Sequence, residues 1–254
     1  MSAPTPEPIP PAPLSNVRVV LCQTSHPGNI GACARAMKTM GLEHLVLVNP
    51  KFFPHAEAEA MASRATDILS RARVCTRLDE ALSGTVFAAA STARNRDLSH
   101  PVLSPREAAV RMMQEARHGP VALVMGAEKY GLTVEEVNRC SVIASIPANP
   151  EYSSLNLAAA VQLFAYELRM AALDPAPAQQ SFAPATHEDL ERFYVHLEQT
   201  LLEVGFLKPD APKRLMQRMR RLFARSRLER EELNILRGIL AAAQEAARKG
   251  RKVD

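Results

Sequence analysis

Residues 17–48 read VRVVLCQTSHPGNIGACARAMKTMGLEHLVLV. The two ends, Val17–Cys22 and His44–Val48, are short apolar runs, whereas Ile30–Met40 between them carries apolar residues at helical spacing. Strands that are apolar on both faces and alternate with helices are typical of a parallel sheet covered by helices. This stretch therefore predicts a strand–helix–strand unit of an α/β fold.

The same alternation continues along the chain. Three further apolar runs predict strands, and three segments with helical spacing predict helices between and after them. We expect these strands at 85–90, 120–125 and 141–146, and these helices at 105–116, 134–138 and about 154–172. The sequence thus predicts one mostly parallel α/β domain.

Composition divides the 254 residues into four parts. The first 13 residues contain six prolines, which predicts a flexible, disordered tail over 1–15. The α/β domain is expected at 16–173, followed by a Pro/Ala/Gln-rich linker at 174–186. Residues 187–254 are charged and helical in pattern, with helices expected at 190–202, 212–227 and 231–248. The tail has neither the basic segment nor the apolar segment of a signal peptide.

The overall composition excludes several classes of protein. Four scattered cysteines form no C-x-x-C pair and no Cys/His cluster with zinc spacing, so we expect a reduced, cytoplasmic protein without a metal. Cys22 and Cys33 are interpreted as small core residues. No apolar run approaches the ~18–20 residues of a membrane span. The net charge of +4 permits an acidic partner such as RNA without requiring one.

The first motif lies between the first two predicted strands. Asn29 is predicted to cap the helix, with Gly28 allowing the turn before it. Gly31, Arg35 and Lys38 share one stripe of that helix. We expect Gly31 to leave space in which a ligand approaches the backbone while Arg35 holds its anionic group. The alternative is a capped helix with two solvated cations. G-x-G-x-x-G and G-K-[ST] phosphate loops are absent.

Two further motifs follow predicted strands. Residues 121–132, VALVMGAEKYGL, place Glu128 and Lys129 on a loop at a strand's carboxyl end, where open α/β sheets bind ligands. The alternative is a connector whose glycines serve geometry alone. The stretch AAASTAR (88–94) likewise ends a strand in small hydroxyl residues.

The third motif, SIPANPEYSSLNLAAAV, covers residues 145–161. Ser153 or Ser154 is predicted to cap the following helix, and Asn156 is expected in its first turn beside unsatisfied backbone N–H groups. Small residues and free donors suit a flat ligand pressed against the backbone. The alternative is an ordinary capped helix.

A resemblance to a known family rests on these motifs taken in order. NIGACARAMKTMGL, GAEKYGL and IPANPEYSSLNLAAAVQ are similar to the three motifs of the SpoU branch of the SPOUT RNA methyltransferases, in particular the TrmJ-type tRNA (cytidine/uridine-2′-O)-methyltransferases. The resemblance covers residues 16–173 and continues through LERFYVHLEQTLLEVGF and ELNILRGIL. It implies a C-terminal trefoil knot, a homodimer, S-adenosylmethionine as cofactor and tRNA as substrate.

The resemblance also implies roles for individual residues. Arg35 matches the catalytic arginine of motif one, and Asn29 and Glu128 match other motif positions. Lys129 and Tyr130 fill variable positions, which leaves the details of the substrate open. The residues implied to bind the cofactor are Ser91, Thr92, Ala93, Gly126, Ile146, Ser153, Ser154, Leu155 and Asn156.

The implied reaction is transfer of a methyl group to a ribose 2′-hydroxyl at the first nucleotide of the anticodon loop, position 32. A guanidinium has a pKa of roughly 12.5–13.8, so we do not interpret Arg35 as a base. We expect it to bind a phosphate and to stabilise the negative charge that develops on the attacking oxygen. Glu128 is expected to orient Arg35 or to accept the proton through water. Ribosomal RNA, another tRNA position, or a non-catalytic RNA-binding protein remain alternatives.

A basic segment, KRLMQRMRRLFARSRLER, covers residues 213–230 with eight Lys or Arg and one acidic residue. Leu215, Met219 and Leu222 form its predicted apolar stripe, so the basic side chains are predicted to belong to an amphipathic helix. Alternatives to tRNA contact are a solvated face and a membrane-surface helix. The residues predicted to bind RNA are Arg35, Lys38, Arg214, Arg218, Arg220, Arg221 and Arg225.

Overall fold

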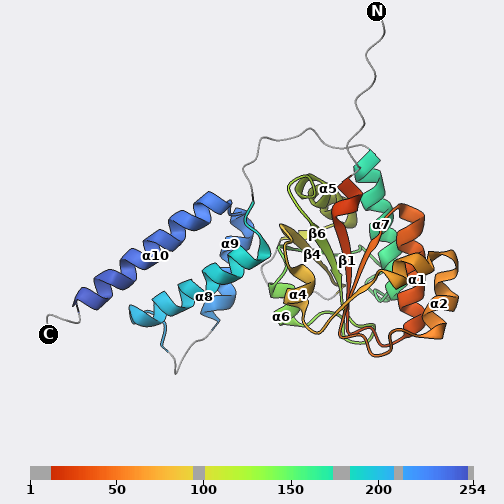
Figure 1. Cartoon of the computed structure of the whole chain (residues 1–254), viewed down its shortest axis with the longest axis horizontal. Coiled ribbons are helices and arrows are strands. Elements are labelled where there is room, and N and C mark those ends of the chain that lie inside the picture. The colour runs from red at the N-terminus through yellow and green to blue at the C-terminus, as the bar shows by residue number, and fades with distance from the viewer. Residues whose placement is uncertain (1–12, 94–100, 174–183, 209–213, 251–254) are drawn as a thin grey trace, which may run out of the picture.

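The computed structural model describes residues 13–93, 101–173, 184–208 and 214–250. A seven-stranded sheet has the order β3-β2-β1-β6-β4-β7-β5, and every strand pair is parallel (Figure 1). The predicted parallel α/β domain is therefore confirmed. The strands are β1 Val17–Cys22, β2 His44–Val48, β3 Arg73–Cys75, β4 Phe87–Ser91, β5 Val102–Leu103, β6 Val121–Met125 and β7 Val142–Ala144.

Helices cover both faces of the sheet (Figure 1). One face packs against α1, α2, α3, α5 and α7, whereas α4 and α6 lie over the other. Along β1, Val19 and Leu21 belong to the first cluster and Val20 and Cys22 to the second, which explains why the strand is apolar on both faces from Val19 onward. These helices are α1 Pro27–Met40, α2 Ala56–Ala62, α3 Thr66–Ser70, α4 Leu78–Leu82, α5 Pro105–Glu115, α6 Val134–Asn138 and α7 Leu157–Leu173.

The C-terminal helices form a separate unit beside the sheet domain (Figure 1). They are α8 His187–Glu203, α9 Leu215–Ser226 and α10 Arg230–Gly250, as the sequence predicted to within a few residues. The long helices α8 and α10 lie side by side, and Phe193, Leu197 and Leu233 belong to the unit's own apolar cluster. This cluster is separate from the two clusters of the sheet.

Several elements differ from the sequence prediction for physical reasons. The strands β3 and β5 have three and two residues, too few for a periodic pattern to stand out, and Arg73 and Val74 are exposed. The short helices α2, α3 and α4 were not predicted either. At the start of the chain, Pro13–Asn16 forms a 3-10 helix and Leu14 is buried in the core, while residues 1–12 and most of the predicted linker lie outside the described residues.

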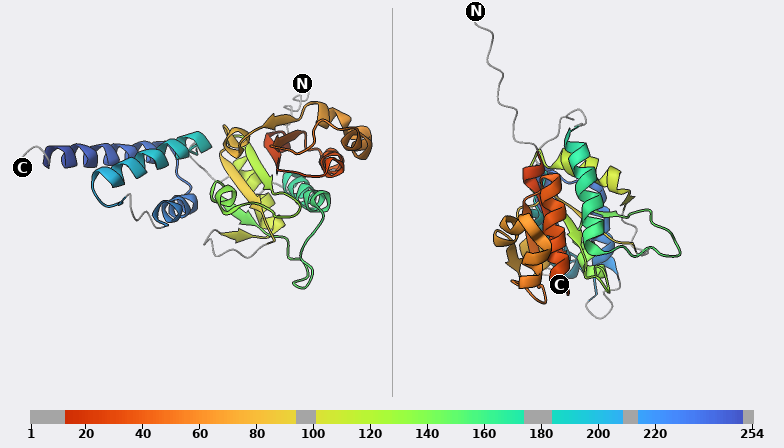
Figure 2. Two further views of the ribbon diagram at one scale, coloured as in Figure 1. Left: turned by 90° about the horizontal axis from the view of Figure 1, so that it is seen from below. Right: turned by 90° about the vertical axis from the view of Figure 1, so that its right-hand side faces the viewer.

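Helices α1 and α7 run side by side on one face of the sheet, as the right-hand view of Figure 2 shows. Their neighbouring N-termini bring the first and third motifs together at the same edge of the sheet. All four cysteines are buried and free, and burial raises the pKa of the Cys22 and Cys33 thiols, which confirms their interpretation as core residues.

Candidate functional site

A cavity of about 250 Å³ lies at the carboxyl ends of the neighbouring strands β4, β6 and β7. This is the edge at which open α/β sheets bind ligands. Eight of the nine residues that the sequence predicted for the cofactor line it: Ser91, Thr92, Ala93, Gly126, Ile146, Ser153, Ser154 and Leu155. Lining residues that the sequence did not single out include Met125, Gly131, Leu157 and Ala160. The structure therefore joins three distant segments around one space.

The loop after β6 folds back so tightly that its two ends are in backbone contact. A Cβ on Gly126 would lie 2.1 Å from the carbonyl carbon of Gly131, so only glycine fits. The amide of Gly131 donates to the carbonyl of Ala127 at 2.7 Å, and Gly131 has a φ of +65°. The glycines of this motif thus shape the loop, and the backbone forms part of the cavity wall.

Glu128 lies on this loop and accepts hydrogen bonds from the segment that precedes α1. Its carboxylate accepts from the amide of Ser25 at 3.0 Å, the hydroxyl of Ser25 at 2.9 Å, the amide of His26 at 3.3 Å and Nδ2 of Asn29 at 2.9 Å. Partial burial alone would raise the pKa of Glu128, but the donors outweigh it and hold the pKa at about 2. The side chain is therefore a permanent anion at neutral pH.

Asn156 connects the third motif to the same network. Its Nδ2 donates to Oδ1 of Asn29 at 3.1 Å, and its Oδ1 accepts from the amides of Ala158 at 2.9 Å and Ala159 at 3.4 Å. Asn156 therefore caps α7, and the predicted cap at Ser153 or Ser154 is wrong. The bonds also fix which way both amide groups face, because each oxygen has a donor and each nitrogen an acceptor.

The start of α1 differs from the prediction. The helix begins at Pro27, with His26 at the N-cap, so Asn29 lies in the first turn instead of capping it. Proline is favoured at the first helical position because it lacks the N–H that would be unsatisfied there. A Cβ on Gly31 would lie 2.0 Å from the carbonyl oxygen of Ala58. Gly31 therefore permits close packing of α1 on α2, and the predicted open space above Arg35 is wrong.

The two cations of α1 have different surroundings. Arg35 is exposed and contributes neither to the lining of the cavity nor to the hydrogen bonds on Glu128. Lys38 pairs with Asp67 at 2.6 Å and donates to the carbonyl of Arg64 at 2.9 Å. Within one chain, the network thus provides no support for Glu128 orienting Arg35.

The basic helix α9 presents only part of its charge to solvent. Arg214, Arg218 and Arg225 are exposed, whereas Arg220 forms a two-point ion pair with Glu191 at 2.5 and 2.8 Å. The guanidinium of Arg220 also lies 4.4 Å from the ring centre of Tyr194. The face packed on the apolar cluster carries Met216, Met219 and Phe223, while Leu222 is exposed, so the predicted stripe is rotated.

Two properties of the described residues bear on the class of protein. In the part of the chain that the structure describes, no three His, Cys, Asp or Glu side chains gather in a way that would hold a metal ion. Within the same residues, every helix is too short or too polar to cross a membrane.

Comparison with known families gives two matches. The sequence profile of the SpoU rRNA Methylase family matches residues 16–166, and that of the tRNA methyltransferase TrmJ, C-terminal domain, matches residues 188–252. Among curated proteins, the chain is 52% identical to the tRNA (cytidine/uridine-2′-O-)-methyltransferase TrmJ of Pectobacterium atrosepticum, covering 91% of this chain and 98% of that protein. The enzyme of the same name from Klebsiella pneumoniae is 51% identical over the same shares.

Solved structures are similar as well. TrmJ from Z. mobilis ZM4 aligns with a TM-score of 0.77 at 34% identity, covering 89% of this chain and 97% of that one. A structure described as giving insights into the 2-OH methylation of C/U34 on tRNA aligns with a TM-score of 0.51 at 27% identity, covering 64% of this chain and 99% of that one.

Proposed function

The chain belongs to the SpoU rRNA Methylase family, and we propose that it transfers a methyl group from S-adenosylmethionine to the ribose 2′-hydroxyl of cytidine or uridine in tRNA. The observation that carries this proposal is 52% identity to a tRNA (cytidine/uridine-2′-O-)-methyltransferase over 98% of that enzyme. The match includes both the sheet domain and the C-terminal helices. We propose the first nucleotide of the anticodon loop, position 32, as the target.

The cavity fits the proposed cofactor. Its small side chains, and the backbone of the tightly folded loop at residues 126–131, form a wall against which a flat group can lie. Glu128 lines the cavity and is anionic, so it favours a cation there. When bound, S-adenosylmethionine supplies an electrophilic methyl group on a positively charged sulfonium. These features support Ser91, Thr92, Ala93, Gly126, Ile146, Ser153, Ser154 and Leu155 as cofactor-binding residues, with Asn156 holding their loop in place.

Glu128 is better suited to fix the site than to take a proton. With a pKa of about 2 it is a weak base, and its oxygens already accept from Ser25, His26 and Asn29. We propose that it binds the segment before α1 to the cavity loop. Arg35 remains our candidate for holding the RNA phosphate and stabilising charge on the attacking oxygen.

Arg35 does not line the cavity of its own chain, so we propose that the complete site forms between two copies in a homodimer. Helix α7 supports this proposal because its outer face carries a stripe of exposed apolar residues, with exposed fractions of 43–67%: Leu163, Tyr166, Met170 and Leu173. A stripe of this kind on the helix next to α1 suits a second copy of the same chain. Arg35 would then reach the partner's cavity.

Membership of the family suggests a knotted fold, an RNA-binding role for the C-terminal helices and a cellular location. We infer that the C-terminal part of the 16–173 domain is threaded into a trefoil knot and that residues 187–254 bind tRNA. A cytoplasmic location follows from a tRNA substrate. The exposed Arg214, Arg218 and Arg225 provide the charge on α9 for this contact.

A second candidate is methylation at position 34. The solved structure that concerns C/U34 methylation aligns over 99% of its own length but covers only 64% of this chain. About a third of this chain therefore has no counterpart in that protein. We favour position 32 because the TrmJ C-terminal domain is present.

Unmodified tRNA transcripts test the proposal directly. Purified protein with labelled S-adenosylmethionine is expected to methylate a wild-type transcript and one with 2′-deoxyribose at position 34, but not one with 2′-deoxyribose at position 32. Methylation of the 32-deoxy transcript and none of the 34-deoxy transcript would move the target to 34. Calorimetric binding of S-adenosylhomocysteine without any transfer would instead indicate a non-catalytic or differently targeted protein.

A further inference from the structure

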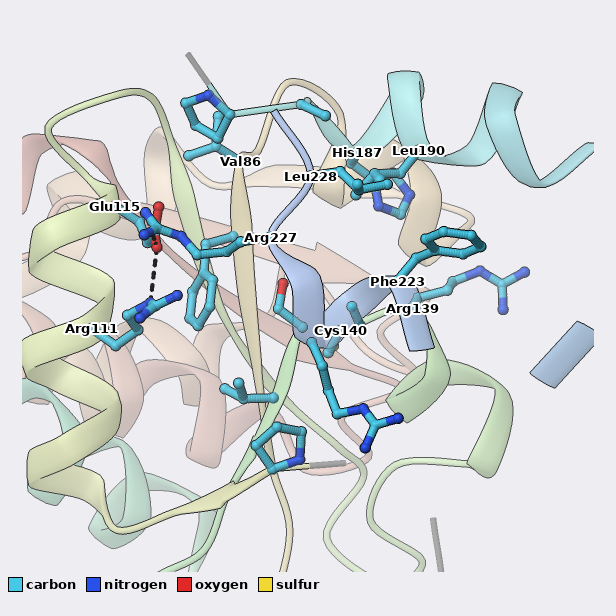
Figure 3. Close-up of a pocket in the computed structure, with 18 of the residues that line it drawn as sticks. Val86, Arg111, Glu115, Arg139, Cys140, His187, Leu190, Phe223, Arg227 and Leu228 are labelled. Atoms are coloured by element: carbon cyan, nitrogen blue, oxygen red, sulfur yellow. Dashed lines mark ion pairs between the residues drawn. The ribbon is translucent and has the colours of Figure 1, made fainter. Parts of the chain in front are cut away.

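A buried carboxylate joins the sheet domain to the C-terminal helices. Glu115, at the end of α5, is 1% exposed. It pairs with Nε of Arg111 at 2.9 Å and with Nη2 of Arg227 at 2.5 Å. Arg111 belongs to the same helix, whereas Arg227 follows α9 in the other unit, and both guanidinium groups approach the same carboxylate oxygen, Oε1 (Figure 3). Leaving such a carboxylate without a partner would be costly.

Arg227 adopts a backbone conformation that favours glycine. It has a φ of 52° and a ψ of 56° and ends α9 as its C-cap. A left-handed conformation is unfavourable for a residue with a Cβ, and Gly or Asn is usual at helix ends of this kind. Such strain persists where surrounding contacts hold the residue in place. The ion pair with Glu115 is one such contact.

The two units are held together by polar contacts around an open space. A cavity of about 530 Å³ lies between them, lined by α5 and the β4 and β7 strands on one side and by α8 and α9 on the other (Figure 3). At the start of α8, Glu188 accepts from the amide of Gly84 at 2.8 and 2.9 Å, and the amide of His187 donates to the carbonyl of Thr85 at 2.8 Å. Arg227 forms a second attachment.

We propose that Arg227 and Glu115 are positioning residues that set the orientation of the basic helix α9 relative to the methyl-transfer site. The start of α8 and the contact of α9 with α6 hold one side of the helical unit, and Arg227 adds an attachment to α5 that helps to fix the angle between the units. A tRNA that contacts both units gains from having the second contact already in place, since the effective concentration of that contact depends on geometry. This inference rests on the proposed function for its kinetic consequence, but not for its structural one.

The ion pair can be separated from a general effect of charge. Glu115→Gln keeps the shape of the side chain and makes the protein more positive. If only charge mattered, this substitution would leave tRNA binding unchanged or strengthen it. Positioning predicts the opposite sign. Arg227→Gly removes the guanidinium while suiting the left-handed backbone, so it tests the ion pair without straining α9. Arg225→Gln is the matched control, since Arg225 is an exposed arginine at the end of the same helix.

The experiment combines steady-state kinetics on tRNA with hydrogen–deuterium exchange of the full-length protein. Glu115→Gln and Arg227→Gly are both expected to raise the KM for tRNA by roughly tenfold with kcat changed less than twofold. Both should speed exchange over residues 184–190, where the amide of His187 is bonded across the units, without affecting β6. Arg227→Lys should recover part of the KM, and Arg225→Gln should leave exchange unchanged.

Two results would overturn the inference. One is tRNA binding by Glu115→Gln that equals or exceeds that of the wild type. The other is unchanged exchange over 184–190 in Arg227→Gly. If the wild-type protein methylated no tRNA, the proposed function would fail, while the exchange measurement would still decide whether the ion pair holds the units together.

Discussion

Nδ2 of Asn156 donates to Oδ1 of Asn29 at 3.1 Å, so the cap of α7 is bonded to the first turn of α1 across 127 positions of sequence. Asn29 in turn donates to Glu128 at 2.9 Å. One continuous chain of hydrogen bonds therefore crosses all three motifs. We expect the groups in this partly exposed chain of hydrogen bonds to be coupled, because each bond orients the next group.

This relationship predicts energetic coupling between Asn29 and Asn156. Each substitution to Ala should destabilise the fold by about 1–2 kcal/mol, since one removes a donor to Glu128 and the other removes a helix cap. The double variant should lose less than the sum of the two single losses, by about 0.5–1 kcal/mol. Urea denaturation at pH 7 measures all three variants. Asn234→Ala, on the exposed face of α10, is the control and should combine additively with Asn29→Ala.

The low pKa of Glu128 predicts how stability depends on pH. Its pKa of about 2 lies below the ordinary value of 4.5, so its stabilising effect is complete above pH 4.5 and is lost as the pH falls toward 2. Because Glu128 is only partly buried and solvent screens its interactions, the wild type should exceed Glu128→Gln in unfolding free energy by about 1–2 kcal/mol at neutral pH, and the gap should close in acid. Denaturation at pH 7, 4 and 3 checks this. A constant gap would mean that the carboxylate is not held by these donors.

The same pKa predicts the pH profile of methyl transfer. Glu128 does not titrate between pH 5 and 9, so the residual activity of Glu128→Gln should show the same pH dependence as the wild type, at a lower level. The rate is measured with saturating tRNA across that range. Loss of a limb of the profile in the variant would restore Glu128 as the proton acceptor.

Gly126 provides a test of the cavity wall. Gly126→Ala should abolish binding of S-adenosylhomocysteine, because the new Cβ would lie 2.1 Å from the backbone of Gly131 and would move the loop. Gly238→Ala is the control, since Gly238 lies within α10 with nothing near its Cβ position. It should leave binding intact and stabilise the protein by up to about 1 kcal/mol. Calorimetry and thermal unfolding separate the two results.

Much of the sheet could be predicted from the sequence, because β1 and β2 are apolar on both faces and their bounds follow that pattern. The resemblance of the three motifs indicated which residues would surround the cavity. What the sequence could not provide is long-range contact. The proximity of Ala58 to Gly31 depends on the packing of α2, an element with a weak periodic signal, so the sequence alone predicts open space beside the glycine.

Side-chain partners were hidden for the same reason. Asn29 is a good cap by type, but Pro27 sets the helix start, and only the fold shows that Glu128 and Asn156 occupy its amide group. Arg220 is a plausible RNA ligand by sequence, yet Glu191 from α8 already binds it. Ser25 could have been suspected, since it directly precedes the motif, but its bond to Glu128 spans 103 positions.

The exposed stripe of α7 predicts how dimerisation can be disrupted. Leu163→Glu combined with Met170→Glu should convert the proposed dimer to a monomer, because two charges would be buried against the second copy. If Arg35 acts across the interface, the rate of methyl transfer should fall when the dimer is lost. Val195→Glu on α8, where the side chain is 55% exposed, is the control and should remain dimeric. Sedimentation velocity gives the mass, and an active monomeric variant would contradict the shared site.

The unequal surroundings of the α9 arginines predict unequal effects on tRNA binding. Arg218 is exposed, so Arg218→Gln should reduce the slope of log affinity against log salt by about 1, as expected for loss of one phosphate contact. Arg220 is held by Glu191, so Arg220→Gln should change the slope less, although it should destabilise the C-terminal helices because it leaves a carboxylate without its partner. Filter binding between 50 and 200 mM salt measures both slopes. Equal slopes for the two variants would mean that Arg220 leaves Glu191 to contact the RNA, and an unchanged slope for Arg218→Gln would remove this part of α9 from the interface.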